Sequence, residues 1–337
     1  METQHFDWWA LIGPVPLGAP AGIIAVPHDR ARTLSGPWQV GPLNLRPGER
    51  LYREYRTLEP LQLAGVSEAE TYPIIVEGDW ADCRAAFPAD HLQGQQSNER
   101  SALMALHRLC CLLALAWGEG WQVRTAPEDP ERLPPQVPES WPRPPMAPSP
   151  AWSLDPDPQP LPSWIAPAWD LAAADEALAS ALTFWHQGLL LTSDFPSFAL
   201  VALSGCIEAL ASCGAFQGLV EADDKPCGAC GTRTGASRRF WSTVGLVADE
   251  DEVRRLRRDW DAYGRRSAVA HGRTTHGVET AFGSVFLLRY RPPAAGEPAR
   301  FEIDDADPSQ VFMLGVLPAV GNVTAQLLYK ALGAGAP

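Results

Sequence analysis

The chain has 337 residues, a length typical of two domains of about 100–200 residues each, and either half is long enough to bury a core. Its net charge of −13 excludes a protein that coats nucleic acid over its whole surface. The number of cysteines is odd, at seven, and no basic segment precedes the first apolar run, so we expect a cytoplasmic protein without disulfides. No apolar window of about 18 residues is uninterrupted, so no membrane span is expected.

Residues 1–125 predict a mixed α+β domain. Short β-favouring runs broken by Gly and Pro are "PAGIIAVP", "GPWQVGPLNL", "ERLYREYRTL" and "TYPIIVEGDW", and "GWQVRTAP" has the pattern of a last strand. A helix is expected from about Asn98 to Trp117, with Asn98 as its N-cap. His107, Cys110 and Cys111 fall inside this apolar helix, which favours a buried structural role for them.

Residues 126–169 form a proline-rich connector. Fifteen of the 33 prolines lie between Ala126 and Pro167. Proline fixes φ and lacks a backbone N–H, so neither a helix nor a central strand is expected there. The segment is predicted to be an extended, partly polyproline II linker.

Residues 170–333 predict an almost entirely helical domain. Asp170 is a suitable N-cap for a helix that runs to Leu191. Pro196 suits the first turn of a second helix, which is expected to end near Gly214.

The later helices of this domain complete a predicted bundle. A short helix is expected over 236–247, and a longer one over 248–272 has an acidic start and a basic end, which suits the helix macrodipole. A loop or strand pair near 278–303 precedes a closing helix over 307–333, expected to bend at Pro318. Helices with such short connections make a helical bundle.

A local basic region lies within this acidic chain. Between Lys225 and Arg273, eleven Lys/Arg and six Asp/Glu give a local charge of +5. Binding follows local potential more than net charge, so Arg254, Arg258 and Arg273 are candidates for contacts with RNA phosphates. A solvated helix face is the alternative interpretation.

The stretch "YGRRSAVAHG" within this region pairs Arg266 with His271, and Gly272 follows. Residues five apart on a helix differ by about 140° in direction and ~7.5 Å in rise, but a glycine ends helices and lets the last turn loosen. A guanidinium can hold a phosphate with two hydrogen bonds, and an imidazole can move protons near neutral pH. The alternative is that both cations only complement the helix C-terminus.

The C-terminal part of the chain resembles the HEPN superfamily. The hallmark of that superfamily is an Arg, four to six residues and a His near the end of a helix in an all-α bundle. "RSAVAHG" is similar to the ApeA-like branch, in which an Arg-Ser pair precedes a His-Gly pair. "ALSGCIEALAS" resembles another helix of that branch, and "TGASRRFW" resembles the segment that leads from a glycine to its motif helix. The resemblance covers about residues 170–333.

The resemblance implies a metal-independent endoribonuclease that works as a dimer, with two motifs facing each other across a groove. The ribose 2′-hydroxyl would attack the neighbouring phosphate and leave a 2′,3′-cyclic phosphate. Arg266 would bind the phosphate, and His271 would act as acid or base. Ser267 stands where many active members have Asn, Asp or His. Arg265 is a second candidate arginine, and Glu208 is expected to pair with the motif arginine or to form a surface salt bridge.

In biological terms, the resemblance implies an effector in phage defence or a toxin-like system. A regulatory protein or an antidote would then be its partner, in addition to RNA. The alternative is a non-catalytic HEPN dimer that acts as a scaffold or sensor and binds RNA or a protein. No cofactor is expected for catalysis.

A second motif, "KPCGACG", contains Cys227 and Cys230. Two cysteines in this spacing can present thiolates to one tetrahedral zinc ion, which needs two further ligands. Cys213 is the nearer candidate for a third ligand and Cys206 the more distant one. A plain loop with two free thiols is the alternative to a structural zinc site.

Overall fold

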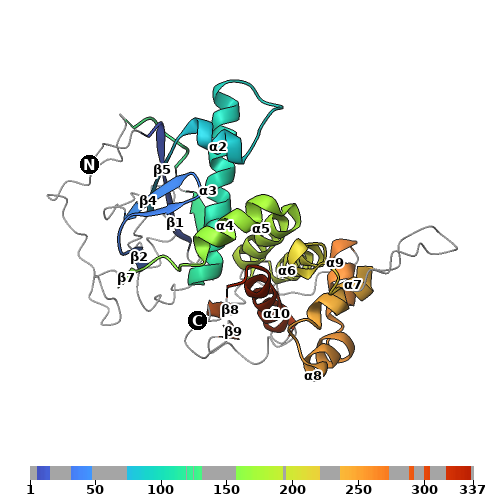
Figure 1. The fold of residues 1–337 in the computed structure, drawn as a ribbon. Helices are drawn as coiled ribbons and strands as arrows, with labels where there is room; N and C mark the ends of the chain where they lie inside the picture. The colour runs from blue at the N-terminus through green and yellow to red at the C-terminus, as the bar shows by residue number, and fades with distance from the viewer. Residues whose placement is uncertain are drawn as a thin grey trace. The chain divides into compact units, whose positions relative to one another are not determined.

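The protein is described by a computed structural model, drawn in Figure 1. The described residues are 6–15, 32–47, 74–118, 120–123, 125–130, 157–192, 195–220, 236–272, 288–291, 300–303 and 316–334. The chain divides into two compact units, one of Met1–Cys110 with Gly120–Trp169 and one of Cys111–Glu119 with Asp170–Pro337. The predicted α+β class is confirmed, because a five-stranded antiparallel sheet occurs together with many helices.

The first unit contains the antiparallel sheet, with strand order β3-β4-β5-β1-β6. The bounds are β1 Trp8–Val15, β3 Trp38–Val40, β4 Leu43–Pro47, β5 Ile74–Gly78 and β6 Gly120–Val123. Four of these strands come from runs that the sequence marked as β-favouring. "PAGIIAVP" and "ERLYREYRTL" lie outside the described residues.

Strand β1 was not predicted, although it lies inside the sheet between β5 and β6. Trp8, Ala10 and Ile12 are fully buried on one face, and Trp9 and Leu11 are buried on the other. Both faces of the strand are therefore apolar, and the alternation of apolar and polar residues that identifies a half-buried strand is absent.

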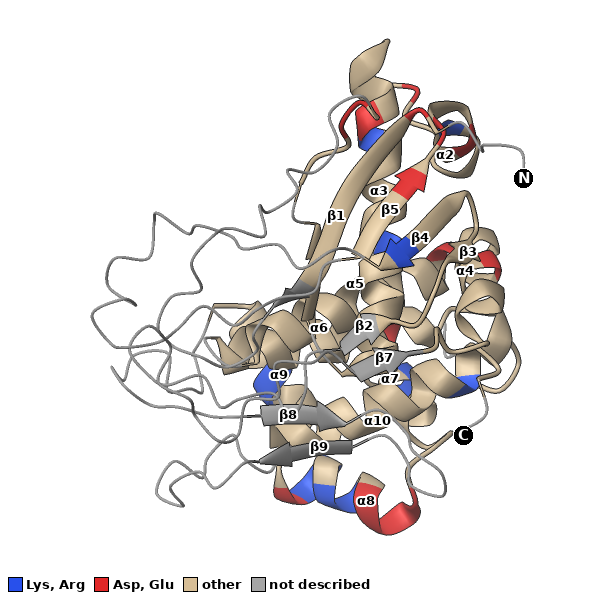
Figure 2. Cartoon of the chain, turned by 90° about the vertical axis from the view of Figure 1, so that its left-hand side faces the viewer, with Lys and Arg blue, Asp and Glu red and all other residues tan. Residues whose placement is uncertain are grey.

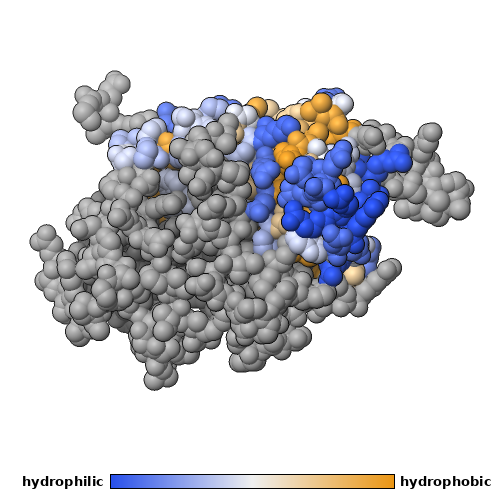
Figure 3. Space-filling view, turned by 90° about the horizontal axis from the view of Figure 1, so that it is seen from below, coloured by the Kyte–Doolittle hydropathy of each residue, from blue (hydrophilic) through white to orange (hydrophobic). Residues whose placement is uncertain are grey.

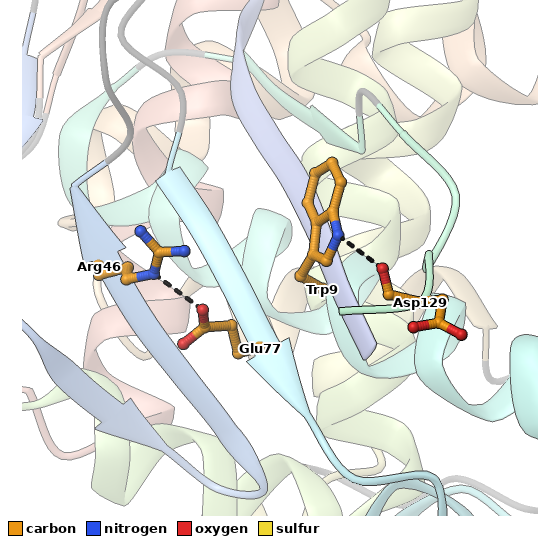
Figure 4. Close-up of polar contacts among 4 residues, drawn as sticks. All are labelled: Trp9, Arg46, Glu77 and Asp129. Atoms are coloured by element: carbon orange, nitrogen blue, oxygen red, sulfur yellow. Dashed lines mark hydrogen bonds and ion pairs between the residues drawn. The ribbon is translucent and has the colours of Figure 1, made fainter. Parts of the chain in front are cut away.

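Polar side-chain contacts join two strands of the sheet and connect β1 to the segment that contains Asp129 (Figure 4). Arg46 Nε of β4 donates to Glu77 Oε1 of β5 at 2.8 Å, which joins two neighbouring strands. Trp9 Nε1 of β1 donates to the carbonyl oxygen of Asp129 at 3.1 Å. The indole of Trp9 is therefore buried while its only polar atom keeps a partner.

The long helix α3 (Gln95–Trp117) follows α2 (Trp80–Ala86). The predicted N-cap at Asn98 is wrong, because Asn98 N donates to Gly94 O and already belongs to the first turn. By length and composition α3 could cross a membrane, but the buried core helix of a globular protein meets the same criteria. Because 72% of its most apolar window is buried within the protein, a core helix is the simpler interpretation.

The described part of the connector contains an edge strand, which the prediction allowed, and the start of a helix, which corrects it; residues 131–156 lie outside the described residues. Strand β7 (Asp157–Gln159) pairs in parallel with β2 (Arg32–Leu34), in a sheet of these two strands. Helix α4 (Ile165–Ala174) also begins inside the connector. Pro158 is tolerated because β7 pairs on one side, and Pro167 lies in the first turn, where no N–H is required.

The helix predicted over 170–191 is interrupted, and α5 (Glu176–Leu191) begins after the break. The N-cap is Asp175 rather than Asp170, because the Asp175 carboxylate accepts from Ala177 N at 2.9 Å and Leu178 N at 3.1 Å. Its second oxygen accepts from Gly214 N at 2.6 Å. Asp175 thus lies between two helices, caps the second of them and holds Gly214, which follows a later helix.

Helix α6 (Pro196–Leu210) packs against α5 in the second unit. It ends at Leu210, before the predicted end at Gly214, and Gly214–Phe216 forms a short 3₁₀ turn. A Cβ at Gly188 of α5 would lie 2.8 Å from the Leu203 side chain, so a glycine allows the two helices to approach closely.

Helix α10 (Val316–Ala331) is tied to other parts of the second unit. Tyr329 Oη donates to Leu115 O at 2.7 Å, and Lys330 Nζ donates to Leu246 O at 2.8 Å. Residues 307–315 of the predicted closing helix lie outside the described residues, so the bend expected at Pro318 stays a prediction. The predicted strand pair is present as β8 (Leu288–Arg291) and β9 (Arg300–Ile303).

The helix predicted over 236–247 is α7 (Ala236–Val244). The helix predicted over 248–272 is divided into α8 (Glu250–Arg254), a π-helix (Arg255–Asp259) and α9 (Ala262–Ala270). The break before α9 is at Asp261, whose φ of 46° is the one positive value outside glycine among the described residues. Continuous amphipathicity predicted one helix and gave no sign of this break.

We expect Gly41→Ala to destabilise the first unit more than Gly94→Ala. Both glycines have a positive φ, 54° and 57°, but a Cβ at Gly41 would lie 2.2 Å from Nε1 of Trp169, whereas Gly94 has open space. The shared backbone strain costs about 1–2 kcal/mol, and steric overlap adds about 1 kcal/mol or more at Gly41. Urea unfolding followed by tryptophan fluorescence measures both losses. Equal losses would contradict the close contact with Trp169.

Candidate functional site

The candidate site is built around an ion pair between Arg266 of α9 and Glu208 of α6. Arg266 Nη2 donates to Glu208 Oε2, and the two side chains are only 19% and 29% exposed. The guanidinium carbon also lies 5.5 Å from the ring centroid of Tyr263. A carboxylate and an aromatic face therefore fix the position of the motif arginine.

The charge of Glu208 depends on its surroundings. Burial raises the pKa of Glu208 above its usual value, while Arg266 and, more weakly, Arg239 lower it. Burial outweighs the arginines, so the net shift is upward even though the carboxylate is in an ion pair. The folded protein therefore holds a proton on Glu208 more readily than the unfolded chain does. The contribution of Glu208 to the free energy of unfolding declines as the pH rises through the folded pKa.

Arg239 of α7 connects this pair to the end of α6. It donates to the hydroxyl of Ser212 and, at 3.5 Å, to the carbonyl of Ala211. Cations are favourable at a helix C-terminus, where carbonyl groups lack helical partners. The site thus combines two arginines from two helices with one carboxylate from a third.

His271 lies at the C-terminal end of α9, as the sequence predicted from Gly272. Its backbone N–H donates to Ser267 O at 3.0 Å, and Gly272 has a φ of 64°. The imidazole is exposed, and within the described residues no hydrogen bond joins it to Arg266. Ser267 is half-buried. The structure brings Arg266 to Glu208, and it leaves His271 open to solvent at the helix end.

Arg265 has a structural contact of its own. Its Nε donates to the carbonyl of Trp260 at 2.6 Å, at the corner between the π-helix and α9. Asp261 at this corner lies against Gly264, where a Cβ would be 2.2 Å from the carboxylate. Arg265 therefore stabilises the corner, which leaves Arg266 as the stronger candidate for a phosphate contact.

The other predicted RNA contacts differ in their environments. Arg254 forms an ion pair with Asp251, one turn earlier on the same helix. Arg258 is exposed, and Arg273 lies outside the described residues. Figure 2 shows acidic residues at the start of α8 and basic residues toward its end, so the charges are separated along this element.

Tyr263 and Arg239 are parts of the site that sequence reasoning missed. Tyr263 is half-buried and packs beneath Arg266. Its position three residues before Arg266 places both on neighbouring positions of one helix face, and this spacing was the available signal. Phe240 is 1% exposed and belongs to the core.

The predicted zinc ligands Cys227 and Cys230 lie outside the described residues. Cys206 and Cys213, considered as further ligands, are buried, and burial raises the pKa of both thiols. Elsewhere in the second unit, Cys111 Sγ and a ring nitrogen of His186 lie within 4.8 Å of each other.

Comparison with known proteins found no matching family model, no matching curated protein and no matching solved structure. Any assignment of function to this chain therefore depends on its own residues and on the resemblance of its Arg–His segment. The residues that bear most directly on it are Arg266, Glu208 and His271.

We expect Glu208→Gln to change the free energy of unfolding at neutral pH by no more than about 1 kcal/mol. Burial raises the pKa of Glu208, so the cost of burying its charge offsets the gain from the ion pair with Arg266. Glutamine can still accept a hydrogen bond from Arg266, so the change removes mainly the charge. Glu250→Gln, at an exposed position, is the control, and chemical denaturation is the measurement. A loss of more than about 2 kcal/mol for Glu208→Gln would contradict this balance.

Proposed function

We propose that the protein is a metal-independent endoribonuclease of HEPN type. The observation that carries this proposal is the arrangement of Arg266, which Glu208 and Tyr263 hold on the helix that ends in the exposed His271. An arginine fixed by a carboxylate is preorganised for an anion, and an exposed imidazole can exchange protons with a substrate. The two functional groups lie on one rigid element, and this favours precise positioning.

In the proposed reaction, the 2′-hydroxyl oxygen attacks the adjacent phosphorus while the bond from phosphorus to the 5′-oxygen breaks. His271 as base takes the proton of the 2′-hydroxyl, and an imidazolium as acid gives a proton to the leaving 5′-oxygen. Arg266 stabilises the negative charge on the phosphate oxygens. The products are a 2′,3′-cyclic phosphate and a 5′-hydroxyl, and no redox change or cofactor is required.

A second copy of the chain would supply the second imidazole and close the groove. One exposed helix end encloses little of a substrate, whereas two facing motifs do so. Phe184, Phe195 and Phe198 are large apolar residues of the α5–α6 region and are 43–48% exposed. Exposed apolar side chains that gather on one region favour a protein interface, and we propose that it is the surface of a two-fold homodimer.

A non-catalytic function is the second candidate. Ser267 cannot titrate where many active relatives of the resembled family have a titratable or amide side chain, and Glu208 already occupies the motif arginine. Under this hypothesis the dimer is a scaffold or sensor that binds RNA or a protein. In either case we propose a cytoplasmic role in phage defence or a toxin-like system, with a regulatory protein or antidote as a further partner.

We expect His271→Ala to abolish RNA cleavage without unfolding the protein. General acid–base groups contribute about 10²–10⁴-fold to rates, and the exposed His271 contributes little to packing. Arg266→Lys should also lose activity, because lysine lacks the planar fork. His91→Ala and Arg84→Lys are the matched controls at exposed positions. Cleavage of mixed RNAs in EDTA and the melting temperature are the measurements.

Cleavage by His271→Ala at the wild-type rate would refute this mechanism. Binding of RNA by the wild-type protein with no cleavage at all would support the non-catalytic candidate.

We expect the protein to be a dimer in solution and Phe198→Asp to shift it to a monomer. A carboxylate placed in an apolar interface loses solvation without gaining a partner. Light scattering at tens of micromolar gives the mass, and Met104→Asp, at an exposed position on α3, is the control. A monomeric wild-type protein under these conditions would contradict the dimer.

A further inference from the structure

We propose that α7 and the π-helix form a base-stacking subsite for single-stranded RNA, built from two arginine–tryptophan pairs. The Arg255 guanidinium carbon lies 5.4 Å from the ring centroid of Trp260, and that of Arg257 lies 6.0 Å from the ring centroid of Trp241. Both arginines are exposed, and both tryptophans are half-buried. The choice of RNA as the ligand rests on the proposed function.

The π-helix creates the first pair. Residues five apart on an α-helix differ by about 140° in direction, so Arg255 and Trp260 would lie on different sides of a regular helix. In the π-helix, Trp260 N donates to Arg255 O at 3.0 Å, and the two side chains come together. The π-helix is rare and appears frequently at functional sites. This local irregularity therefore requires an explanation, and the alignment of an arginine with an indole provides one.

The surrounding contacts hold the pair in place. Arg265 Nε donates to Trp260 O, and the side chain of Asp261 folds against Gly264. These contacts fix the backbone on the C-terminal side of Trp260. A preorganised aromatic residue binds with less loss of conformational freedom than a mobile one.

Arginine next to an indole suits a nucleotide. Bases stack on aromatic rings and on guanidinium planes, and a guanidinium can donate hydrogen bonds from its edge to phosphate oxygens. An exposed guanidinium beside a half-buried indole offers both contacts to one nucleotide. Two such pairs offer stacking positions for two bases of one single strand, whereas paired bases within a duplex present no free ring faces.

A continuous series of ring contacts leads from this subsite to the candidate catalytic arginine. Trp241 lies 5.0 Å from Phe240 between ring centroids, Phe240 lies 5.2 Å from Tyr263, and Tyr263 packs beneath Arg266. The Arg257–Trp241 pair is therefore close to Arg266 through packed side chains. A strand bound by the two pairs would be positioned near the phosphate site.

The local charge also favours a stacking contact over a purely electrostatic one. Hydrophilic residues gather in Figure 3 on the side of the molecule where α8 lies in Figure 1. Acidic residues at Asp249–Glu252 and at Asp259 accompany the arginines, so the surface is mixed rather than uniformly basic. Binding should therefore depend on bases more than on phosphate charge, with a shallow dependence on salt.

The test compares binding of two 12-nucleotide strands by fluorescence anisotropy. One is labelled 2′-O-methyl oligouridine, which blocks attack by the 2′-hydroxyl, and the other is a matched strand without bases. We expect Trp260→Leu and Trp241→Leu each to weaken binding of oligouridine about 5-fold or more, as loss of a stacked base predicts. Binding of the abasic strand should not change. Arg255→Lys, which keeps the charge but loses the planar group, should weaken oligouridine binding as well.

Trp38→Leu and Arg84→Lys are the matched controls, because both residues are exposed and lie in the other unit. Unchanged oligouridine binding by the tryptophan variants would overturn the proposal. Equal weakening for both strands would also overturn it, because the surface would then recognise charge alone. If the abasic strand and an acidic polypeptide bind as tightly as oligouridine, the surface is one for an acidic partner and the proposal is wrong.

The same variants distinguish a failure of the stacking subsite from a failure of the proposed nuclease function. If the wild-type protein cleaves RNA while the tryptophan variants bind as it does, the subsite is wrong and the nuclease stands. If binding depends on bases and on Trp260 but no cleavage occurs, the subsite stands and the nuclease is wrong.

Discussion

The ion pair between Arg266 and Glu208 is the constraint on which the site depends. A half-buried guanidinium needs a counter-charge, and Glu208 provides it from a helix 58 residues away in the sequence. The pair joins the middle of α9 to α6, while Tyr263, on the same helix as Arg266, packs against the guanidinium. Because the arginine is held by two neighbours, its position is set by the bundle and does not depend on a ligand.

The same contact limits how a phosphate can bind. Glu208 already accepts from Nη2, and Nε of Arg266 is buried with no hydrogen-bond partner among the described residues. Unless it displaces Glu208, a phosphate is therefore left with the two N–H groups of Nη1 and the second N–H group of Nη2. Protonation of Glu208 would weaken the ion pair, and burial favours the protonated form because it raises the pKa of Glu208. The site thus couples anion binding to the charge of one carboxylate.

The sequence predicted the α+β class, most helices and the end of the motif helix at Gly272, because each follows from local periodicity or from one terminator. It missed β1, whose two apolar faces lack alternation, and it missed the break at Asp175, since a capping aspartate and a surface aspartate look alike in sequence. Glu208 was predicted as a partner of Arg266, but Arg239 was not. The packing of α7 on α6 brings Arg239 to this site, and periodicity does not contain that information.

The division of the predicted helix over 248–272 has a structural consequence for both proposals. An uninterrupted helix from Glu250 to Ala270 would be about 30 Å long and straight. The π-helix and the positive φ of Asp261 instead change the chain direction, and α9 packs against α6. This change of direction allows Arg266 to reach Glu208, and the π-helix places Arg255 beside Trp260. The irregular corner, costly in itself, therefore builds the phosphate site and the stacking pair together.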